Sequence, residues 1–144
     1  MTFGRSVSTC FHKYVDFKGR ASRSEFWWFL LFVTLVGILA GFLDNLLGLT
    51  YTSTDSTYVV NGIDYTLYAN SFGWLYTLWV LATALPTLAV GARRLHDRSS
   101  SGWWQLLLLC CSIVGFLILT IVWWIQPSQP GENQYGPPPG SGAI

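Results

Sequence analysis

The residues best suited to chemistry lie in one short polar segment, residues 92–104, with the sequence ARRLHDRSSSGWW. His96 and Asp97 are adjacent there, and an imidazole beside a carboxylate is a combination used for metal binding and for acid–base catalysis. A zinc site needs three or four ligands, but the chain has one other histidine, His12, with Cys10 near it. We therefore expect no metal, no cofactor and no catalytic residue, and a membrane enzyme that uses His96 and Asp97 is the least favoured hypothesis.

Arginine dominates the polar segments around this pair. Guanidinium groups form forked hydrogen bonds to phosphate, and tryptophan prefers the headgroup layer of a bilayer. Two interpretations stay open: a site for anionic lipid headgroups, or ordinary ion pairs between Asp97 and arginines, and we favour the ion pairs. The candidate cluster comprises Arg20, Arg23, Arg93, Arg94, His96, Asp97 and Arg98, flanked by Trp27, Trp28, Trp103 and Trp104.

These residues belong to a chain that carries very little charge. Of its 144 residues, 51% are hydrophobic and 10% are charged, and the formal net charge is +1. A soluble domain has about 25% charged residues, so most of this surface must face something other than water. The composition argues against a soluble enzyme, and the net charge gives no reason for nucleic-acid affinity. The sequence predicts a small integral membrane protein.

Three uncharged stretches are long enough to cross a bilayer, which takes roughly 17–25 apolar residues. They cover residues 26–43, 72–92 and 103–125, and none of them contains Asp, Glu, Lys, Arg or His. Tryptophans gather at the ends of these stretches, as they do in the aromatic belts of membrane proteins. The sequence therefore predicts an all-α membrane protein with three transmembrane helices.

The basic residues predict the orientation of these helices. All eight Lys and Arg residues precede residue 26 or lie in residues 93–102. The positive-inside rule then places the N-terminus in the cytoplasm and the C-terminus outside it. The expected order is a cytoplasmic segment (1–25), a membrane domain (26–125) with an outer loop (44–71) and an inner loop (93–102), and a Pro/Gly-rich extracytoplasmic tail (126–144).

Shorter patterns predict local structure in the connecting segments. An apolar face over residues 7–15 predicts a short amphipathic helix, which lies in the inner interface or packs on the ends of the spans. Ser22 and Glu25 have the spacing of a capping box, so we expect them to cap the first span. In the outer loop, Asn61 and Gly62 lie between β-prone residues and allow a small hairpin.

Small residues within the apolar stretches indicate helix packing. Gly37 and Gly41 form a G-x-x-x-G pattern, and Gly115 belongs to a similar pattern in the third stretch. This spacing lets helices approach closely within one chain, between copies or against another membrane protein. Pro86 is expected to kink the second stretch. Asp44 ends the first stretch at the outer boundary, where it can be hydrated.

Three ordered motifs resemble those of a known family. Residues 17–27, FKGRASRSEFW, resemble its first signature, and RRLHD followed by SGWW, in residues 93–104, resembles its second. Residues 131–137, GENQYGP, resemble its C-terminal signature, with Gln134 where relatives usually carry arginine. The family is that of the YhaH-like proteins of the bacterial inner membrane, whose function is unknown. The resemblance implies an inner (plasma) membrane location and names no activity.

Together these observations predict a scaffold or binding component of the bacterial inner membrane. Its basic, Trp-flanked cytoplasmic face is expected to contact anionic lipid headgroups, with no nucleic acid as partner. A subunit of a transporter or channel is the alternative, although no stretch carries an ionisable residue at mid-depth to serve as a carrier group.

Overall fold

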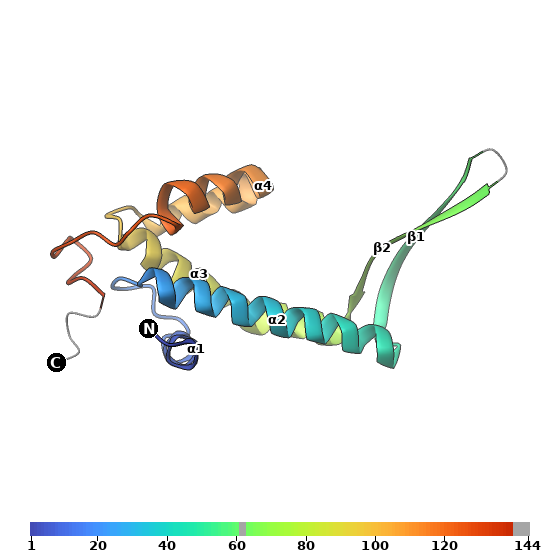
Figure 1. The fold of residues 1–144 in the computed structure, drawn as a ribbon, viewed down its shortest axis with the longest axis horizontal. Coiled ribbons are helices and arrows are strands. Elements are labelled where there is room, and N and C mark those ends of the chain that lie inside the picture. Colours follow the sequence, from blue (N-terminus) through green and yellow to red (C-terminus); the bar gives the residue numbers. More distant parts are fainter. Residues whose placement is uncertain (61–62, 140–144) are drawn as a thin grey trace. The chain divides into compact units, whose positions relative to one another are not determined.

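The computed structural model describes residues 1–60 and 63–139, and most of these residues are helical. They form two compact units: residues 1–32 together with the chain from residue 84 onward, and residues 33–83. The elements, in chain order, are α1 (Phe3–His12), α2 (Arg23–Leu47), β1 (Thr50–Val60), β2 (Ile63–Gly73), α3 (Trp74–His96), a 3-10 helix η1 (Gly102–Leu106), α4 (Leu107–Leu119) and a π-helix η2 (Thr120–Trp124) (Figure 1).

Helices α2 and α3 correspond to the first two predicted spans. They have 25 and 23 residues, and among the described residues they are the two helices that are long and apolar enough to cross a membrane. At 1.5 Å per residue each exceeds the roughly 30 Å of a hydrocarbon core. Their exposed surfaces carry large apolar side chains such as Leu35, Ile38, Leu81 and Leu85. Such surfaces suit contact with lipid rather than water.

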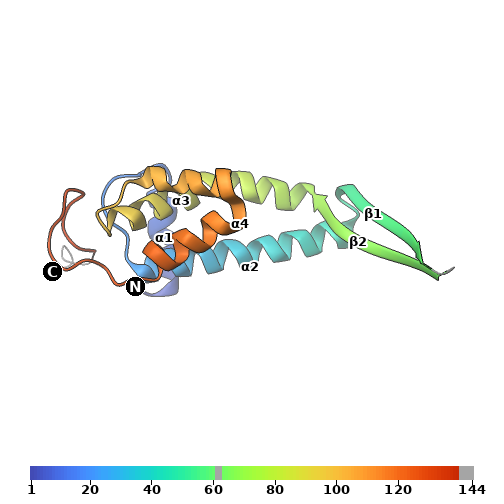
Figure 2. The ribbon, with the colours of Figure 1, turned by 90° about the horizontal axis from the view of Figure 1, so that it is seen from above.

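The third apolar stretch is not one straight crossing, which corrects the predicted span over residues 103–125. The rings of Trp104 and Trp123 lie 5.4 Å apart, whereas a straight α-helix would separate them by roughly 28 Å. Trp123 Nε1 also donates to Ser100 Oγ at 2.6 Å. Figure 2 shows the ribbon of residues 102–124 doubling back, so that both ends of the segment lie together.

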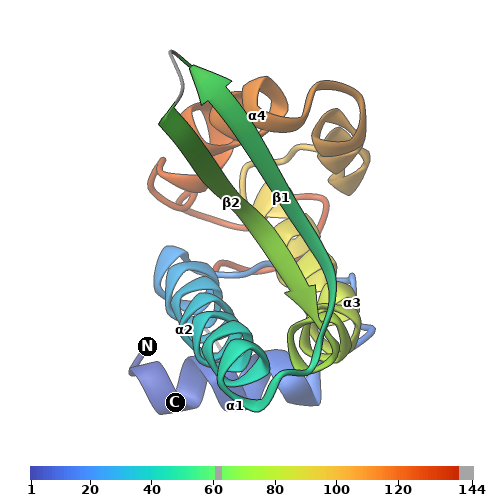
Figure 3. The ribbon, with the colours of Figure 1, turned by 90° about the vertical axis from the view of Figure 1, so that its right-hand side faces the viewer.

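The outer loop contains the hairpin that its sequence allowed, so the chain is not all-α. Strands β1 and β2 pair antiparallel, with Val60 opposite Ile63 and Thr50 opposite Gly73 (Figure 3). β1 is rich in Thr, Tyr and Val, and β2 contains Ile, Tyr, Thr and Phe, and all of these residue types favour a pleated backbone. The predicted turn at Asn61 and Gly62 lies outside the described residues.

The N-terminal amphipathic helix is α1, and it packs on α2 rather than standing apart. Phe3 contacts Trp28 edge-on, with 5.7 Å between ring centroids, and Phe11 contacts Phe29 at 5.6 Å. Ser6 and Cys10 are the buried residues of the helix. The helix begins and ends earlier than the apolar face over residues 7–15 predicted.

The glycines expected to pack helices differ in their surroundings. A Cβ built on Gly37 would lie 3.5 Å from Tyr76 and 3.6 Å from Trp79, which is ordinary contact distance. A Cβ on Gly41 would meet nothing within 4 Å. Gly115 lies in α4 and is buried. Gly37 therefore lies against α3, whereas Gly41 leaves its part of the α2 surface open.

Candidate functional site

The arginine segments meet in a buried ion-pair centre around Asp97. Its carboxylate is fully buried at the end of α3. Arg20 Nε donates to Asp97 Oδ1 at 2.8 Å, and Arg94 Nη1 donates to the other carboxylate oxygen. One carboxylate thereby joins the loop before α2 to the last turn of α3.

A second buried pair lies where α1 meets the start of α2. Arg93 Nη1 donates to Glu25 Oε1 at 2.7 Å, and the Cys10 thiol lies 3.8 Å from the same oxygen. Ser22 Oγ accepts the backbone N–H of Glu25 at 3.1 Å, which is half of a capping box. The Glu25 side chain turns to Arg93 instead of returning to Ser22. Burial and the negative charge of Glu25 raise the pKa of the Cys10 thiol to about 12.

Backbone carbonyls near the C-terminal end of the chain accept hydrogen bonds from two of the buried arginines, Arg20 and Arg94. Three arginines are buried here against two buried carboxylates, so the carboxylates cannot balance every guanidinium group. Arg20 donates to the carbonyl oxygens of Gln129 at 2.6 Å, Gly131 at 2.6 Å and Gly136 at 3.2 Å. Arg94 donates to the carbonyl oxygens of Trp124, at 3.4 Å, and Gln126. The tail is thus part of the site.

This placement bears on the predicted separation of the two ends. If the tail lay on the opposite side of a membrane from Arg20, its three carbonyl oxygens could not accept hydrogen bonds from the Arg20 guanidinium group. The physical cause is the doubling back of residues 102–124, which returns the chain to the level at which α3 ends. An N-terminal segment and a tail on opposite sides would not allow these contacts, and the side on which each end lies stays a prediction.

The GENQYGP motif shapes the tail for this contact. Gly131 and Gly136 have φ of +85° and +115°, a backbone region that favours glycine. Asn133 pairs with Gly136 in an isolated bridge, and its side-chain amide donates to the His96 carbonyl oxygen at 3.0 Å. The Tyr135 ring stacks on His96, with centroids 3.9 Å apart. The sequence alone marked this motif only by resemblance, because the groups that act in it are mainly carbonyls, which every residue carries.

Two members of the predicted cluster keep access to the surface. Arg23 is exposed and donates to the Ile125 carbonyl oxygen at 3.3 Å, and Arg98 donates to that of Pro127 at 3.2 Å. Arg23 borders a hollow of about 630 Å³. The other residues that line this hollow are Ser22, Ser24, Trp27, Ile125 and Ser128.

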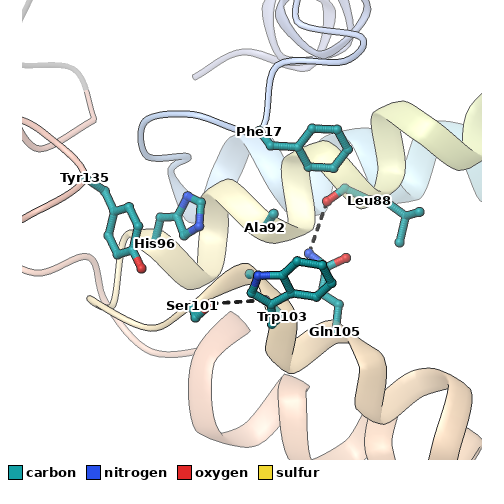
Figure 4. Close-up of a pocket in the computed structure, with 9 residues that line it drawn as sticks. Phe17, Leu88, Ala92, His96, Ser101, Trp103, Gln105 and Tyr135 are labelled. Carbon is teal, nitrogen blue, oxygen red and sulfur yellow. Dashed lines mark hydrogen bonds between the residues drawn. The ribbon is translucent and has the colours of Figure 1, made fainter.

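His96 borders a different cavity, of about 510 Å³. Figure 4 shows Phe17 and Trp103 on either side of Ala92, with the stacked His96 and Tyr135 at one end. His96 therefore stands apart from the ion pairs of its neighbour Asp97. In the described part of the chain, no three His, Cys, Asp or Glu side chains gather at metal-binding distance.

In the second unit, Asp44 caps α3. Its carboxylate accepts the backbone N–H groups of Leu75 at 3.0 Å and Tyr76 at 2.8 Å. The side chain is fully buried, so the expectation that it would be hydrated is wrong. A Cβ added to Gly73 would overlap the carboxylate, so this close approach requires glycine.

Comparison with known proteins identifies relatives along most of the chain. A sequence profile described as "Protein of unknown function (DUF805)" matches residues 14–137. The inner membrane protein YhaI of Escherichia coli (strain K12) is 35% identical over 130 residues, which cover 90% of this chain and 91% of YhaI. The inner membrane protein YhaH of the same strain is 38% identical over 126 residues, or 88% of each chain. No solved structure matches this chain.

Proposed function

Because this chain belongs to the family described as DUF805, whose relatives here are inner membrane proteins, we propose that it is a non-enzymatic binding component of the bacterial inner membrane. In this proposal its ligand is the headgroup of an anionic lipid. The observation that carries the proposal is the hollow beside Arg23.

The hollow combines the groups that recognise a lipid phosphate. Arg23 supplies an exposed guanidinium group with one backbone acceptor, and three serine hydroxyls line the same space. Charge-assisted hydrogen bonds of this kind are the stronger ones that proteins make to phosphate. Trp27 on the rim is partly exposed, as suits a side chain at headgroup level.

The buried arginines serve a structural purpose in this proposal. Arg93 and Arg94 are 0% exposed, and Arg20 has acceptors for all three of its nitrogen atoms. A lipid phosphate could reach them only after displacement of the tail. Arg23 is therefore the arginine from the predicted cluster that we assign to the lipid.

The proposal includes a topology of two crossings, α2 and α3. Each arm of residues 102–124 is about ten residues, or ~15 Å, and enters only half of a ~30 Å hydrocarbon core before it returns. The exposed bases Arg5, Lys13, Lys18 and Arg23 put the N-terminal segment in the cytoplasm by the positive-inside rule, and the tail lies with them. A C-terminal fluorescent-protein fusion should be bright and an alkaline-phosphatase fusion inactive. The reverse pattern would contradict this topology.

Lipid retention measured by native mass spectrometry tests the headgroup site. The protein is purified with mixed phosphatidylglycerol and phosphatidylethanolamine, and Arg23→Gln is compared with Arg5→Gln, which removes an exposed arginine of α1 outside the hollow. Arg23→Gln should reduce retained phosphatidylglycerol roughly fivefold to tenfold, as loss of one charge-assisted contact predicts. Arg5→Gln should retain as much as the wild type. Equal retention by the three folded proteins would refute the site.

A further inference from the structure

The cavity beside His96 has the size and the construction of a ligand site. Its volume of about 510 Å³ lies within the range of roughly 300–1,000 Å³ that is typical of small-molecule pockets. Its walls come from four segments of one unit: Phe17 before α2, Ala92 and His96 on α3, Trp103 on η1 and Tyr135 in the tail. It is a partly open hollow between these segments, not a groove along one helix.

Glycine lets η1 approach α3 beside this space. A Cβ on Gly102 would lie 3.0 Å from the Ala92 side chain, and one on Gly91 would lie 2.9 Å from Gln105 Nε2. Both distances are tighter than side chains normally tolerate. The cavity wall at Ala92 and Gln105 is therefore held in one place by close packing.

The polar groups of the cavity are uncharged, and they include both a hydrogen-bond acceptor and a hydrogen-bond donor. Gln105 Nε2 donates to the Leu88 carbonyl oxygen at 3.1 Å, which leaves its amide oxygen as an acceptor. Ser101 Oγ accepts the Trp103 N–H, which leaves its hydroxyl hydrogen as a donor. Among the nine residues that line the cavity, none is Asp, Glu, Lys or Arg. A charged headgroup would find no counterion there, so the ligand is neutral.

The remaining walls favour a flat ring on an apolar chain. Figure 4 shows the rings of Phe17 and Trp103 on either side of Ala92, and aromatic rings pack well against planar groups. Leu88, on α3, and Trp103 are 43% and 77% exposed, so the rim opens on the apolar surface that faces lipid. A ligand that enters by this rim comes from the bilayer.

We propose that this cavity binds the ring of a membrane-soluble quinone. Such a ring is planar and neutral: in the oxidised quinone a carbonyl group can accept from Ser101, and in the reduced quinol a hydroxyl group can donate to Gln105. Its isoprenoid chain leaves past Leu88 into the lipid. The proposal concerns binding alone and does not depend on the headgroup site at Arg23.

Photolabelling tests the assignment in the full-length protein in nanodiscs of zwitterionic lipid. The probe is an azido-benzoquinone with a decyl chain, and labelled peptides are identified by mass spectrometry. Label should fall on residues 101–105, and excess unmodified decyl-benzoquinone should displace it. Label that is spread over the lipid-facing surfaces and is not displaced would overturn the proposal.

A matched pair of variants separates the cavity from the general lipid surface. Leu88→Trp fills the rim, whereas Leu85→Trp adds the same side chain to a position of α3 with similar exposure, 45%, that does not line the cavity. Leu88→Trp should lower displaceable labelling roughly tenfold, and Leu85→Trp should leave it unchanged. Equal effects of the two changes would refute the site. If Leu88→Trp does not fold, displacement of the label by unmodified decyl-benzoquinone in the wild-type protein still tests the site.

Two further controls identify the occupant. Ser101→Ala should weaken quinone labelling but leave unchanged any labelling by a phospholipid with a photoreactive acyl chain. If that phospholipid labels residues 101–105 and quinone does not displace it, the cavity holds an acyl chain and the quinone assignment is wrong. Arg23→Gln should leave quinone labelling as in the wild type, so the two proposed sites can fail separately.

Discussion

The two ends of α3 each hold buried ionised side chains, of opposite sign. At its N-terminal end, Asp44 accepts two backbone N–H groups of the first helical turn. At its C-terminal end, Arg94 donates to backbone carbonyl oxygens of the tail, as does the neighbouring Arg20. Both placements agree with the helix dipole, which favours an anion at the start of a helix and cations at its end. Backbone dipoles balance charge in both regions.

The regions differ in where those dipoles come from. The N–H groups around Asp44 belong to α3 itself and exist as soon as the helix forms. The carbonyls around Arg20 lie more than 100 residues further along the chain, at Gln129 to Gly136. An unpaired helix terminus is a local property, whereas an acceptor for a buried guanidinium group depends on tertiary structure. The arginine region should therefore be the more sensitive to substitution.

The largest effect is expected from Asp97→Asn. It leaves Arg20 and Arg94 buried without their shared carboxylate, which typically costs about 3–5 kcal/mol. The free energy of unfolding in detergent, measured with denaturant, should fall by that amount. Glu132→Gln, which changes an exposed acid of the tail, should leave it unchanged. If both variants had the same free energy of unfolding, the ion pairs of Asp97 would not account for the stability of this region.

Asp44→Ala should have a smaller effect, because the N–H groups of a frayed first turn can find other acceptors. Loss of a helix cap costs about 0.5–2 kcal/mol, so the free energy of unfolding should fall within that range. Asp44→Asn keeps a carbonyl oxygen as acceptor and should lose less than Asp44→Ala. If Asn destabilises more than Ala, hydrogen bonding to Leu75 and Tyr76 is not what the side chain provides.

Tyr135→Ala tests how much of the tail contact is side-chain packing. It removes the ring that stacks on His96, a contact worth about 0.5–1.5 kcal/mol beyond the area it buries. We expect a decrease of that size in the free energy of unfolding. Tyr135→Phe keeps the ring and should behave as the wild type. A loss with Phe equal to that with Ala would assign the effect to the hydroxyl group instead.

The Cys10 thiol, which lies beside Glu25, should have the smallest effect on the stability of the fold near neutral pH. Its pKa is raised to about 12, so the buried thiol stays protonated where an ordinary thiol ionises. Between about pH 9 and 12 the unfolded chain loses this proton before the folded one, and stability should fall as the pH rises. At pH 8, maleimide should modify Cys10 far more slowly in the folded than in the unfolded protein, in a background with Ser at Cys110 and Cys111. Equal rates would show that the thiol is accessible.

Much of the fold follows from local patterns in the sequence. The family, the membrane class and helices α2 and α3 were predicted from motifs and hydropathy, and they are confirmed. The sequence does not reveal the doubled-back segment, because residues 103–125 are uncharged and mostly apolar along their whole length. Hydropathy measures only whether a stretch prefers lipid. It does not measure where Trp104 and Trp123 come to lie.

The candidate site was predictable in its residues but not in its burial. The sequence supplied the arginines of the cluster, yet nothing in their spacing separates the buried Arg20 from the exposed Arg23. That distinction arises because the tail covers one and not the other. The tail itself lacks helical or strand periodicity, so its contribution through main-chain carbonyls had no pattern to reveal it.

The carbonyl acceptors of the tail also set the order in which the protein can mature. A nascent chain leaves the ribosome from its N-terminus, so Arg20 and Arg94 are made before residues 124–136. Until the tail emerges, these guanidinium groups lack its acceptors and have Asp97, the Ala21 carbonyl oxygen and water as partners. Consolidation of this end of the molecule consequently waits for the tail, and a chain that stops before residue 124 leaves Arg20 and Arg94 without those acceptors.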